Sequence, residues 1–411
     1  MAATTASVSA RRRTGQRGNV RLIRSSNHKQ SAESTHNKID SHTNILRCAN
    51  LPCLHHGGMS LLEKISAFDP NAPAMHDANL FGLPFTPEEA RCVVVPVPWE
   101  VTVSYGGGTA GGPAAILEAS RQVDLYDPDY PEAWKLGVAM DALPVRLARE
   151  SRRLRKKTET VLSVLSGKPA RVSAREIARM RADIDAGCRA MIQEVRTTTQ
   201  RWLDAGKLVA LVGGDHSTPL GFLQALAERH PRFGVLQLDA HADLRNAYEG
   251  FAFSHASIMF NALRIPQIKR LVQVGIRDYC REEQEVIARS RGRVITHVDR
   301  DIRRALYRGR NMAALHRDIV KQLPREVYIS FDIDGLDPKL CPHTGTPVPG
   351  GLEFEEALHL IYTVVESGRR IIGFDLNEVC PGDDEWDANV GARLLFRMIN
   401  LMAASRGNST E

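Results

Sequence analysis

The sequence predicts an α/β protein of three layers, with helices on both faces of a mostly parallel β-sheet. From Arg91 onward, short apolar runs rich in β-branched residues alternate with stretches of helical character, which is the pattern of repeated strand–helix–strand units. Nearly all of these runs are apolar on both faces, as expected for strands between two helix layers. The 411 residues are 43% hydrophobic and 25% charged, which is typical of a globular chain. No run is long and apolar enough for a membrane-spanning helix, so no membrane partner is expected.

Seven apolar segments are the predicted strands of this sheet. In chain order they are Cys92 to Val97, Leu208 to Val212, Phe233 to Leu238, Arg270 to Gly275, Arg293 to His297, Glu326 to Phe331 and Arg370 to Asp375.

A helical insertion is predicted at about residues 146–207. Its first part, Ser151 to Lys157, is basic and is interpreted as a solvated helix face, and Gly167-Lys168-Pro169 interrupts the helix. A second helix is predicted to begin at a capping box formed by Ser173 and Glu176. Apolar residues follow at helical spacing and predict a core stripe rather than a site. We therefore expect a single domain over residues 59–411 that includes this insertion.

The first 58 residues differ from the rest in composition. They hold nine Lys or Arg and two acidic residues, a net charge of +7, so the remainder carries −1 of the chain's +6. They contain no Phe, Trp or Tyr, and a disordered basic tail is expected. Three interpretations stay open: a mis-assigned start ahead of Met59, an organellar targeting segment, or a binding arm. Because the basic excess lies in the tail, we expect no nucleic-acid partner.

The cysteines give no sign of a disulfide framework. Their number is odd, seven, they form no CxxC pair, and no secretory signal precedes them, which favours a reducing, cytoplasmic location. Cys48, Cys53, His55 and His56 could hold zinc, but their spacing fits no closed structural site well.

Four predicted strands end in clusters of ionisable side chains. The clusters are GGDHS at 213–217, DAHAD at 239–243, DIDGLDP at 332–338 and DLNE at 375–378. In an open α/β sheet, ligands bind beyond the carboxyl ends of the strands. Residues i and i+2 of an extended chain face the same side, so Asp239 with His241, and Asp332 with Asp334, would each project into one space.

These clusters supply six candidate metal ligands: His216, Asp239, His241, Asp243, Asp332 and Asp334. Many carboxylates with few imidazoles favour hard or borderline divalent ions, manganese or nickel, over a thiolate-held zinc. Six ligands are too many for one small ion, and two bridged ions about 3.5–4 Å apart fit better. A single Asp-x-Asp pair is more often a helix cap or a surface loop, but three such clusters at strand ends favour a metal site.

Together the motifs GGDHS, DAHADLR, SFDIDGLDP and DLNEVCP resemble the ureohydrolase superfamily of arginases, agmatinases and guanidine hydrolases, over about Arg91 to Asn400. The resemblance implies an arginase-like fold and hydrolysis of a guanidino group to urea and an amine or ammonia. It also implies two ligand sets. One ion would be bound by His216, Asp239, Asp243 and Asp332, and the other by Asp239, His241, Asp332 and Asp334.

The resemblance further implies roles in catalysis for three residues. Asp334 would pass a proton to the leaving nitrogen. Glu378 would bind the guanidinium, because the two oxygens of a carboxylate can accept hydrogen bonds from the planar N–H groups of that cation. His255 would be a proton-shuttle or substrate-contact histidine, the alternative being a core histidine.

The identity of the guanidino substrate stays open. The segment after the DAHAD motif, Leu244 to Phe251, lacks the polar pattern of arginases and disfavours arginine. Asp383, Asp384 and Glu385 could receive the distal ammonium of agmatine, or could be a solvated acidic turn. Trp99 and Trp386 could wall a short pocket, or could be ordinary packing. The passages at 96–116 and 385–395 resemble guanidine hydrolases, which favours free guanidine or a small guanidine, with nickel beside manganese.

The sequence also bears on three other classes of protein. A P-loop is excluded, because no GKS or GKT follows Gly106-Gly107-Gly108, and a helix is expected near Pro113. A non-catalytic metal-binding subunit of a hetero-oligomer is disfavoured, because the six ligands and Glu378 are all retained. A zinc deacetylase of related fold would need one metal rather than two.

A homo-oligomer, trimer or hexamer, is implied by the resemblance.

Overall fold

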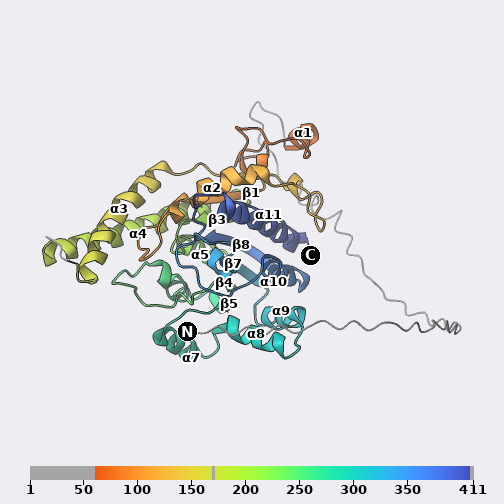
Figure 1. The fold of residues 1–411 in the computed structure, drawn as a ribbon. Coiled ribbons are helices and arrows are strands. Elements are labelled where there is room, and N and C mark those ends of the chain that lie inside the picture. Colours follow the sequence, from red (N-terminus) through yellow and green to blue (C-terminus); the bar gives the residue numbers. More distant parts are fainter. Residues whose placement is uncertain (1–60, 169–171, 408–411) are drawn as a thin grey trace, which may run out of the picture. The chain divides into compact units, whose positions relative to one another are not determined.

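The structure is a computed structural model that describes residues 61–168 and 172–407. In these residues, eight strands form one sheet in the order β2-β1-β3-β8-β7-β4-β5-β6, and every neighbouring pair is parallel (Figure 1). The strands are β1 (Cys92–Val97), β2 (Val138–Met140), β3 (Leu208–Gly213), β4 (Phe233–Leu238), β5 (Ile268–Ile276), β6 (Val294–Val298), β7 (Glu326–Asp332) and β8 (Arg370–Asn377).

All seven predicted strands are present, with ends within two residues of the prediction. The eighth strand, β2, was missed. It has only three residues and pairs with β1 at the edge of the sheet, so it is too short for its apolar character to stand out. The predicted α/β class with a parallel sheet is confirmed.

The helices of the described residues form the two outer layers. They are α1 (Leu61–Ala67), α2 (Gly112–Ala119), α3 (Val145–Leu165), α4 (Ala174–Asp204), α5 (Leu220–Ala227), α6 (Ile258–Ala262), α7 (Arg281–Arg289), α8 (Asp299–Tyr307), α9 (Met312–Val320), α10 (Phe354–Glu366) and α11 (Trp386–Gly407).

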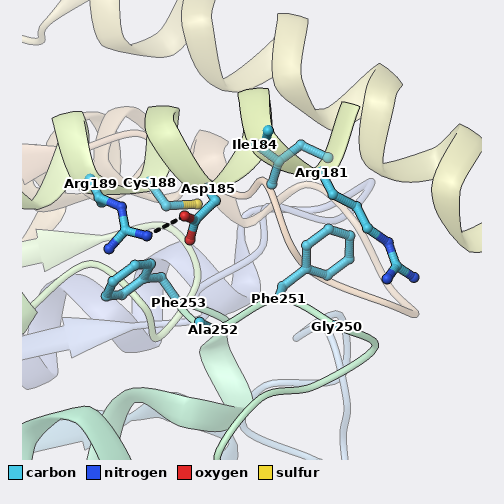
Figure 2. Close-up of a pocket in the computed structure, with 10 residues that line it drawn as sticks. Arg181, Ile184, Asp185, Cys188, Arg189, Gly250, Phe251, Ala252 and Phe253 are labelled. Carbon is cyan, nitrogen blue, oxygen red and sulfur yellow. Dashed lines mark hydrogen bonds and ion pairs between the residues drawn. The ribbon is translucent and has the colours of Figure 1, made fainter. Parts of the chain in front are cut away.

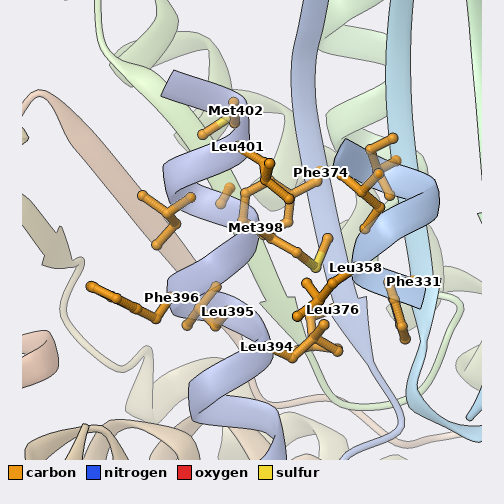
Figure 3. Close-up of a cluster of buried hydrophobic side chains, with 14 of the residues drawn as sticks. Phe331, Leu358, Phe374, Leu376, Leu394, Leu395, Phe396, Met398, Leu401 and Met402 are labelled. Atoms are coloured by element: carbon orange, nitrogen blue, oxygen red, sulfur yellow. The ribbon is translucent and has the colours of Figure 1, made fainter. Parts of the chain in front are cut away.

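In strands such as β1, alternate residues enter two separate hydrophobic clusters, because successive side chains point to opposite faces. In β1, Val94 packs in the cluster that contains α2, α9, α10 and α11, while Val93 and Val95 pack in the cluster that contains α3, α4, α5 and α6. Figure 3 shows part of the first cluster, in which Phe374 of β8 lies among side chains of α10 and α11. The sheet is therefore covered on both faces, as predicted.

The region between β2 and β3 contains the helices α3 and α4. Ser173 and Glu176 form the predicted capping box at the start of α4, where the Ser173 hydroxyl accepts the Glu176 amide at 3.3 Å. The apolar stripe of α4, including Ile184 and Met191, is buried against the sheet cluster, as expected for core residues. These helices leave the strand order intact and pack on one face of it.

Two further predictions from the sequence concern the first 58 residues and membrane-spanning helices. The proposals for residues 1–58, including the zinc candidates Cys48, Cys53, His55 and His56, lie outside the described residues. Among the helices that are described, none combines the length and the apolarity that crossing a bilayer would require.

A candidate metal centre at the carboxyl edge of the sheet

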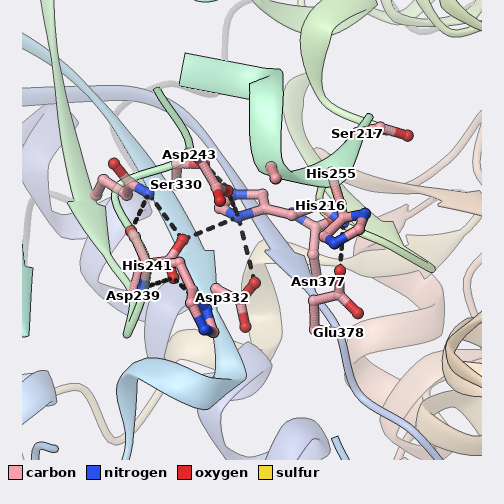
Figure 4. A network of polar contacts seen from close by, with 12 residues as sticks. His216, Ser217, Asp239, His241, Asp243, His255, Ser330, Asp332, Asn377 and Glu378 are labelled. Atoms are coloured by element: carbon pink, nitrogen blue, oxygen red, sulfur yellow. Dashed lines mark hydrogen bonds and ion pairs between the residues drawn. The ribbon is translucent and has the colours of Figure 1, made fainter. Parts of the chain in front are cut away.

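The strands β3, β8, β7 and β4 carry the predicted site residues at their carboxyl ends. They are consecutive neighbours in the middle of the sheet, although β3 and β8 are far apart in sequence. His216 and Asp239 lie just beyond β3 and β4, Asp332 is the last residue of β7, and Glu378 follows β8. The parallel sheet thus brings these side chains to one edge (Figure 4).

His216 lies at the centre of a first group of candidate ligands. Its Nδ1 atom is 3.0 Å from Asp239 Oδ2, 3.1 Å from Asp243 Oδ2 and 3.3 Å from Asp332 Oδ2. All four side chains are buried. One ligand atom from each of His216, Asp239 and Asp332 lies within 4.8 Å of the others, so this group could hold a cation.

His241 belongs to a second group. Its Nδ1 atom is 3.0 Å from Asp334 Oδ2 and 3.7 Å from Asp239 Oδ1, and these three residues also have ligand atoms within 4.8 Å of one another. Asp239 takes part in both groups with different oxygens, Oδ2 toward His216 and Oδ1 toward His241. The six predicted ligands therefore form two adjoining groups that share a carboxylate.

The imidazole of His216 is oriented as a metal ligand would be. Its Nδ1 atom has no hydrogen-bond partner in the described part of the chain, although it is buried. On the other side of the ring, Nε2 lies 2.9 Å from Ser330 Oγ, and the Ser330 hydroxyl donates to Asp375 Oδ1 at 3.0 Å. With its proton on Nε2, the ring directs the Nδ1 lone pair at the carboxylates, which suits a bound cation.

Backbone amides fix the orientation of the carboxylates. The His241 amide donates to Asp239 Oδ1 at 2.6 Å, and the Asp334 amide donates to Asp332 Oδ1 at 2.9 Å. Asp334 in turn accepts the Ala240 amide at 3.0 Å. Asp332 and Asp334 thus keep their Oδ2 atoms directed at the two groups, which is how outer contacts orient metal ligands.

The electrostatics of the site call for added positive charge. Burial, followed by the charges of Asp334 and Asp239, raises the pKa of Asp332 well above its usual value. Burial and then Asp239 raise the pKa of Asp243 to about 7. Although burial alone would lower it, the pKa of His241 rises to about 12, because Asp334 and Asp239 favour the charged ring. Divalent cations would compensate this excess of buried carboxylate.

Glu378 lies against the first group. Its Oε1 atom accepts the backbone amide of His216 at 2.8 Å. Its own amide donates to the carbonyl of Gly214 at 2.8 Å, and its φ of 62° is rare for a residue other than glycine. Burial and the neighbouring charge of Asp215 raise the pKa of Glu378 well above its usual value. A bound cation such as guanidinium would relieve this cost.

Two glycines meet beside Glu378, and we call their contact the glycine bridge. The Gly106 amide donates to the Gly345 carbonyl at 3.3 Å, and a Cβ atom on Gly106 would lie only 2.6 Å from that oxygen. A Cβ atom on Gly345 would lie 3.5 Å from Glu378 Oε2. Backbone without side chains therefore closes one side of the space next to the Glu378 carboxylate.

His255 begins a short 3-10 helix (His255–Ser257) that is capped by Ser254. Its ring packs edge-on with the Tyr248 ring at 6.1 Å between centroids. Burial, followed by the charges of His241 and His216, lowers the pKa of His255 to about 3, so the ring is neutral near pH 7. The structure thus brings His255 into the electrostatic environment of both ligand groups.

The two predicted tryptophans lie in different environments. Trp99 is fully buried in the cluster with α3 and α4, and its indole nitrogen lacks a hydrogen-bond partner in the described chain. Trp386 is the first residue of α11, is 46% exposed, and donates its indole N–H to the Lys339 carbonyl at 3.0 Å. None of these side-chain contacts involves a candidate metal ligand or Glu378, and the role of both tryptophans as pocket walls stays a prediction.

A separate cavity of about 340 Å³ lies between α4 and Gly250–Phe253 (Figure 2). Ile184, Cys188 and Phe251 contribute to its lining, and Arg189 stacks over Phe253 at 4.9 Å. None of its lining residues is a predicted site residue. This cavity is therefore distinct from the candidate metal centre.

Buried polar residues inside the strands are part of the site that the sequence analysis missed. Ser330, Gln237 and Gln273 are all 0% exposed. Gln237 donates to Asp239 Oδ2 at 2.7 Å, and Gln273 donates to Gln237 Oε1 at 2.6 Å. A polar residue in an otherwise apolar central strand was the available signal, because it must find a partner when buried.

Comparison with known proteins agrees with this geometry. The model of the Arginase family matches residues 90–400. N(1)-aminopropylagmatine ureohydrolase of Thermus thermophilus is 33% identical over 329 residues, which cover 80% of this chain and 96% of that protein. Agmatinase of Bacillus anthracis is 28% identical and covers 73% of this chain and 87% of its own length.

Solved structures have the same fold. The agmatine ureohydrolase of Thermoplasma volcanium superposes with a TM-score of 0.60 at 25% identity, covering 83% of this chain and 97% of the other. The proclavaminate amidino hydrolase of Streptomyces clavuligerus also gives a TM-score of 0.60, at 22% identity, covering 82% of this chain and all of its own. With the family model matching three quarters of its length, this chain belongs to the arginase family.

Proposed function

We propose that this protein is a hydrolase of C–N bonds in linear amidines, which cleaves a guanidino group to urea and an amine or ammonia. The observation that carries the proposal is the pair of His/Asp groups sharing Asp239, with Glu378 hydrogen-bonded to the amide of the ligand His216. This arrangement puts a carboxylate that can hold a guanidinium directly beside two places for cations.

We assign two divalent cations, manganese or nickel, to these groups. The donor set of four carboxylates and two imidazoles suits such ions, and the unpartnered Nδ1 atom of His216 fits a metal ligand. When bound, the two cations supply a water of lowered pKa as the nucleophile.

The side chains then act on the substrate. Glu378 accepts hydrogen bonds from the planar guanidinium, and the His216 amide, 2.8 Å from Oε1, holds that carboxylate in place. Asp334 passes the proton that the leaving nitrogen needs. His255, with its pKa lowered to about 3 by burial and by His241, acts as a neutral hydrogen-bonding group near pH 7.

We further propose that the substrate is free guanidine or a small guanidine. The glycine bridge supports this, because its backbone closes one side of the space next to the Glu378 carboxylate. Guanidine and water would give urea and ammonia.

Agmatine or an aminopropyl derivative is the second candidate. The names of the relatives from Thermus thermophilus and Bacillus anthracis favour it. Agmatine and water would give urea and putrescine.

Product analysis separates the two candidates. The full chain, loaded with manganese or with nickel, would be incubated with guanidine, methylguanidine, agmatine, guanidinobutyrate and arginine, while urea, ammonia and putrescine are measured. Urea and ammonia in equal amounts from guanidine, at a kcat/KM above that for agmatine, would support the small-guanidine proposal. A higher kcat/KM for agmatine would support the second candidate, and no urea from any compound with either metal would refute both.

A further inference from the structure

Glu100 lies at the base of the loop that contributes Gly106 to the glycine bridge. Its Oε2 atom accepts three hydrogen bonds from one short stretch of this loop: the Gly108 amide at 2.6 Å, the Ala110 amide at 3.0 Å and the Thr109 hydroxyl at 3.3 Å. A carboxylate that accepts several hydrogen bonds from one loop holds that loop in place, because hydrogen bonds to an ionised acceptor are stronger than those between neutral groups.

The same loop is pressed against the chain that follows Glu378. The Cys380 thiol donates to the Gly107 carbonyl at 3.5 Å. Gly108 has a φ of 123°, which disfavours other residues, and a Cβ atom on it would lie 2.7 Å from Cys380 Sγ. The loop therefore has no room to move toward Cys380, and Glu100 limits its movement the other way.

Helix α3 braces the base of the loop. The amide of Glu100 donates to the hydroxyl of Ser151, a buried residue of α3, at 3.0 Å. The guanidinium of Arg155, one turn further along α3, donates to the carbonyl of Val103. Two residues of the helical insertion thus hold the segment before the loop, one at Glu100 and the other at Val103.

We propose that Glu100 is a positioning residue of the hydrolysis, which keeps the glycine bridge closed beside Glu378 and so sets the width of the substrate space. The inference rests on the proposed function. Without the Glu100 carboxylate, three donors of the loop lose their acceptor, Gly106 can leave Gly345, and the space beside Glu378 widens. Glu100 makes no hydrogen bond to a candidate metal ligand among the described contacts, so metal binding should persist.

The kinetic test compares Glu100→Ala and Glu100→Gln with the wild-type chain, each loaded with the same metal. In Glu100→Ala, kcat/KM for guanidine should fall by about 10- to 100-fold, mainly through KM, the range expected for a loosened positioning group. The ratio of kcat/KM for agmatine to that for guanidine should rise. Glu100→Gln keeps an acceptor oxygen and should recover part of the loss. Thr109→Val, which removes only the longest of the three bonds, is the matched control and should stay near wild type.

A second measurement does not depend on activity. Amide hydrogen exchange over residues 104–112 should accelerate at least tenfold in Glu100→Ala, with an unchanged metal-to-protein ratio. Unchanged exchange in this segment, or loss of metal, would overturn the proposal. If the wild type releases no urea from any guanidine, the proposed function fails, and the exchange data still decide whether Glu100 holds the loop.

Discussion

The Nε2 atom of His216 lies 2.9 Å from the hydroxyl of Ser330, which donates onward to Asp375. This contact joins the loop after β3 to the interior of β7. It also fixes the orientation of the imidazole, whose Nδ1 edge faces Asp239, Asp243 and Asp332. A serine that would otherwise be an unremarkable core residue therefore decides which nitrogen of His216 is free to bind a metal.

Replacing this serine should weaken metal binding. In Ser330→Ala, the His216 ring loses the partner that fixes its tautomer, and the affinity for manganese or nickel should fall by about 10- to 100-fold. Calorimetric titration of the metal-free chain measures this directly. Ser367→Ala, at the end of α10, is the control, and equal affinities in all three proteins would contradict the prediction.

Removing one buried carboxylate should stabilise the metal-free protein and weaken its response to metal. Asp332 is crowded by Asp334 and Asp239 in a buried site, so Asp332→Asn relieves repulsion when no cation is present. In the wild type, metal at a hundred times its Kd should add about 2.7 kcal/mol of stability per site. Thermal unfolding with a chelator and with metal would show a higher Tm for metal-free Asp332→Asn and a smaller metal-induced gain. Asp301→Asn, an exposed aspartate on α8, should behave as wild type.

Neutralising Glu378 should impair substrate binding while sparing the metal. The variant Glu378→Gln keeps the shape and a carbonyl oxygen but loses the charge that pairs with guanidinium. We expect kcat/KM to drop by about a hundredfold or more, in line with the 2–5 kcal/mol typical of breaking a buried charge pair. Metal content should match the wild type, with Glu366→Gln as the control. Activity within a few-fold of wild type would remove Glu378 from the site.

A histidine pair away from the metal centre should make stability depend on pH. His316 on α9 and His359 on α10 face each other with their Nδ1 atoms 2.7 Å apart, and burial, then His359, lowers the pKa of His316 to about 4. Because this value is below that of an unfolded histidine, the unfolded chain binds the proton first. Stability should be fully present above about pH 6.5 and decline toward pH 4, by up to about 1.4 kcal/mol per pH unit.

Denaturant unfolding at pH 7 and pH 5 checks this dependence, with chelator present so that metal release does not contribute. His316→Gln should make the decline less steep, whereas His76→Gln, at an exposed position, should leave it unchanged. An equally steep decline in His316→Gln would rule out the pair as its source.

The sequence was sufficient for the fold and for grouping the six candidate ligands, because both follow from local patterns. Apolar runs predicted seven of the eight strands, and the i, i+2 spacing of Asp239 with His241 predicted that they share one space. The parallel sheet then brings the clusters together, because the carboxyl ends of neighbouring parallel strands lie at the same edge.

Contacts between distant segments could not be predicted in this way. The glycine bridge joins Gly106 to Gly345, and nothing near either glycine in sequence indicates the other. The role of Glu100 could not be predicted either, because a glutamate after a strand indicates nothing unless the course of the next ten residues is known. The environments of Trp99 and Trp386 could not be predicted for a similar reason, since proximity to a motif does not fix whether an aromatic residue points into the core or to the surface.

The strand order has a consequence for how the protein is made. β3 and β4 are consecutive in the chain, yet β8 and β7 lie between them in the sheet. The last strands to leave the ribosome must therefore enter the middle of the sheet. Until β7 arrives with Asp332 and Asp334, the first 325 of the 411 residues hold His216, Asp239 and His241 without their partners. The two groups of candidate ligands can therefore come together only after β7 has been made.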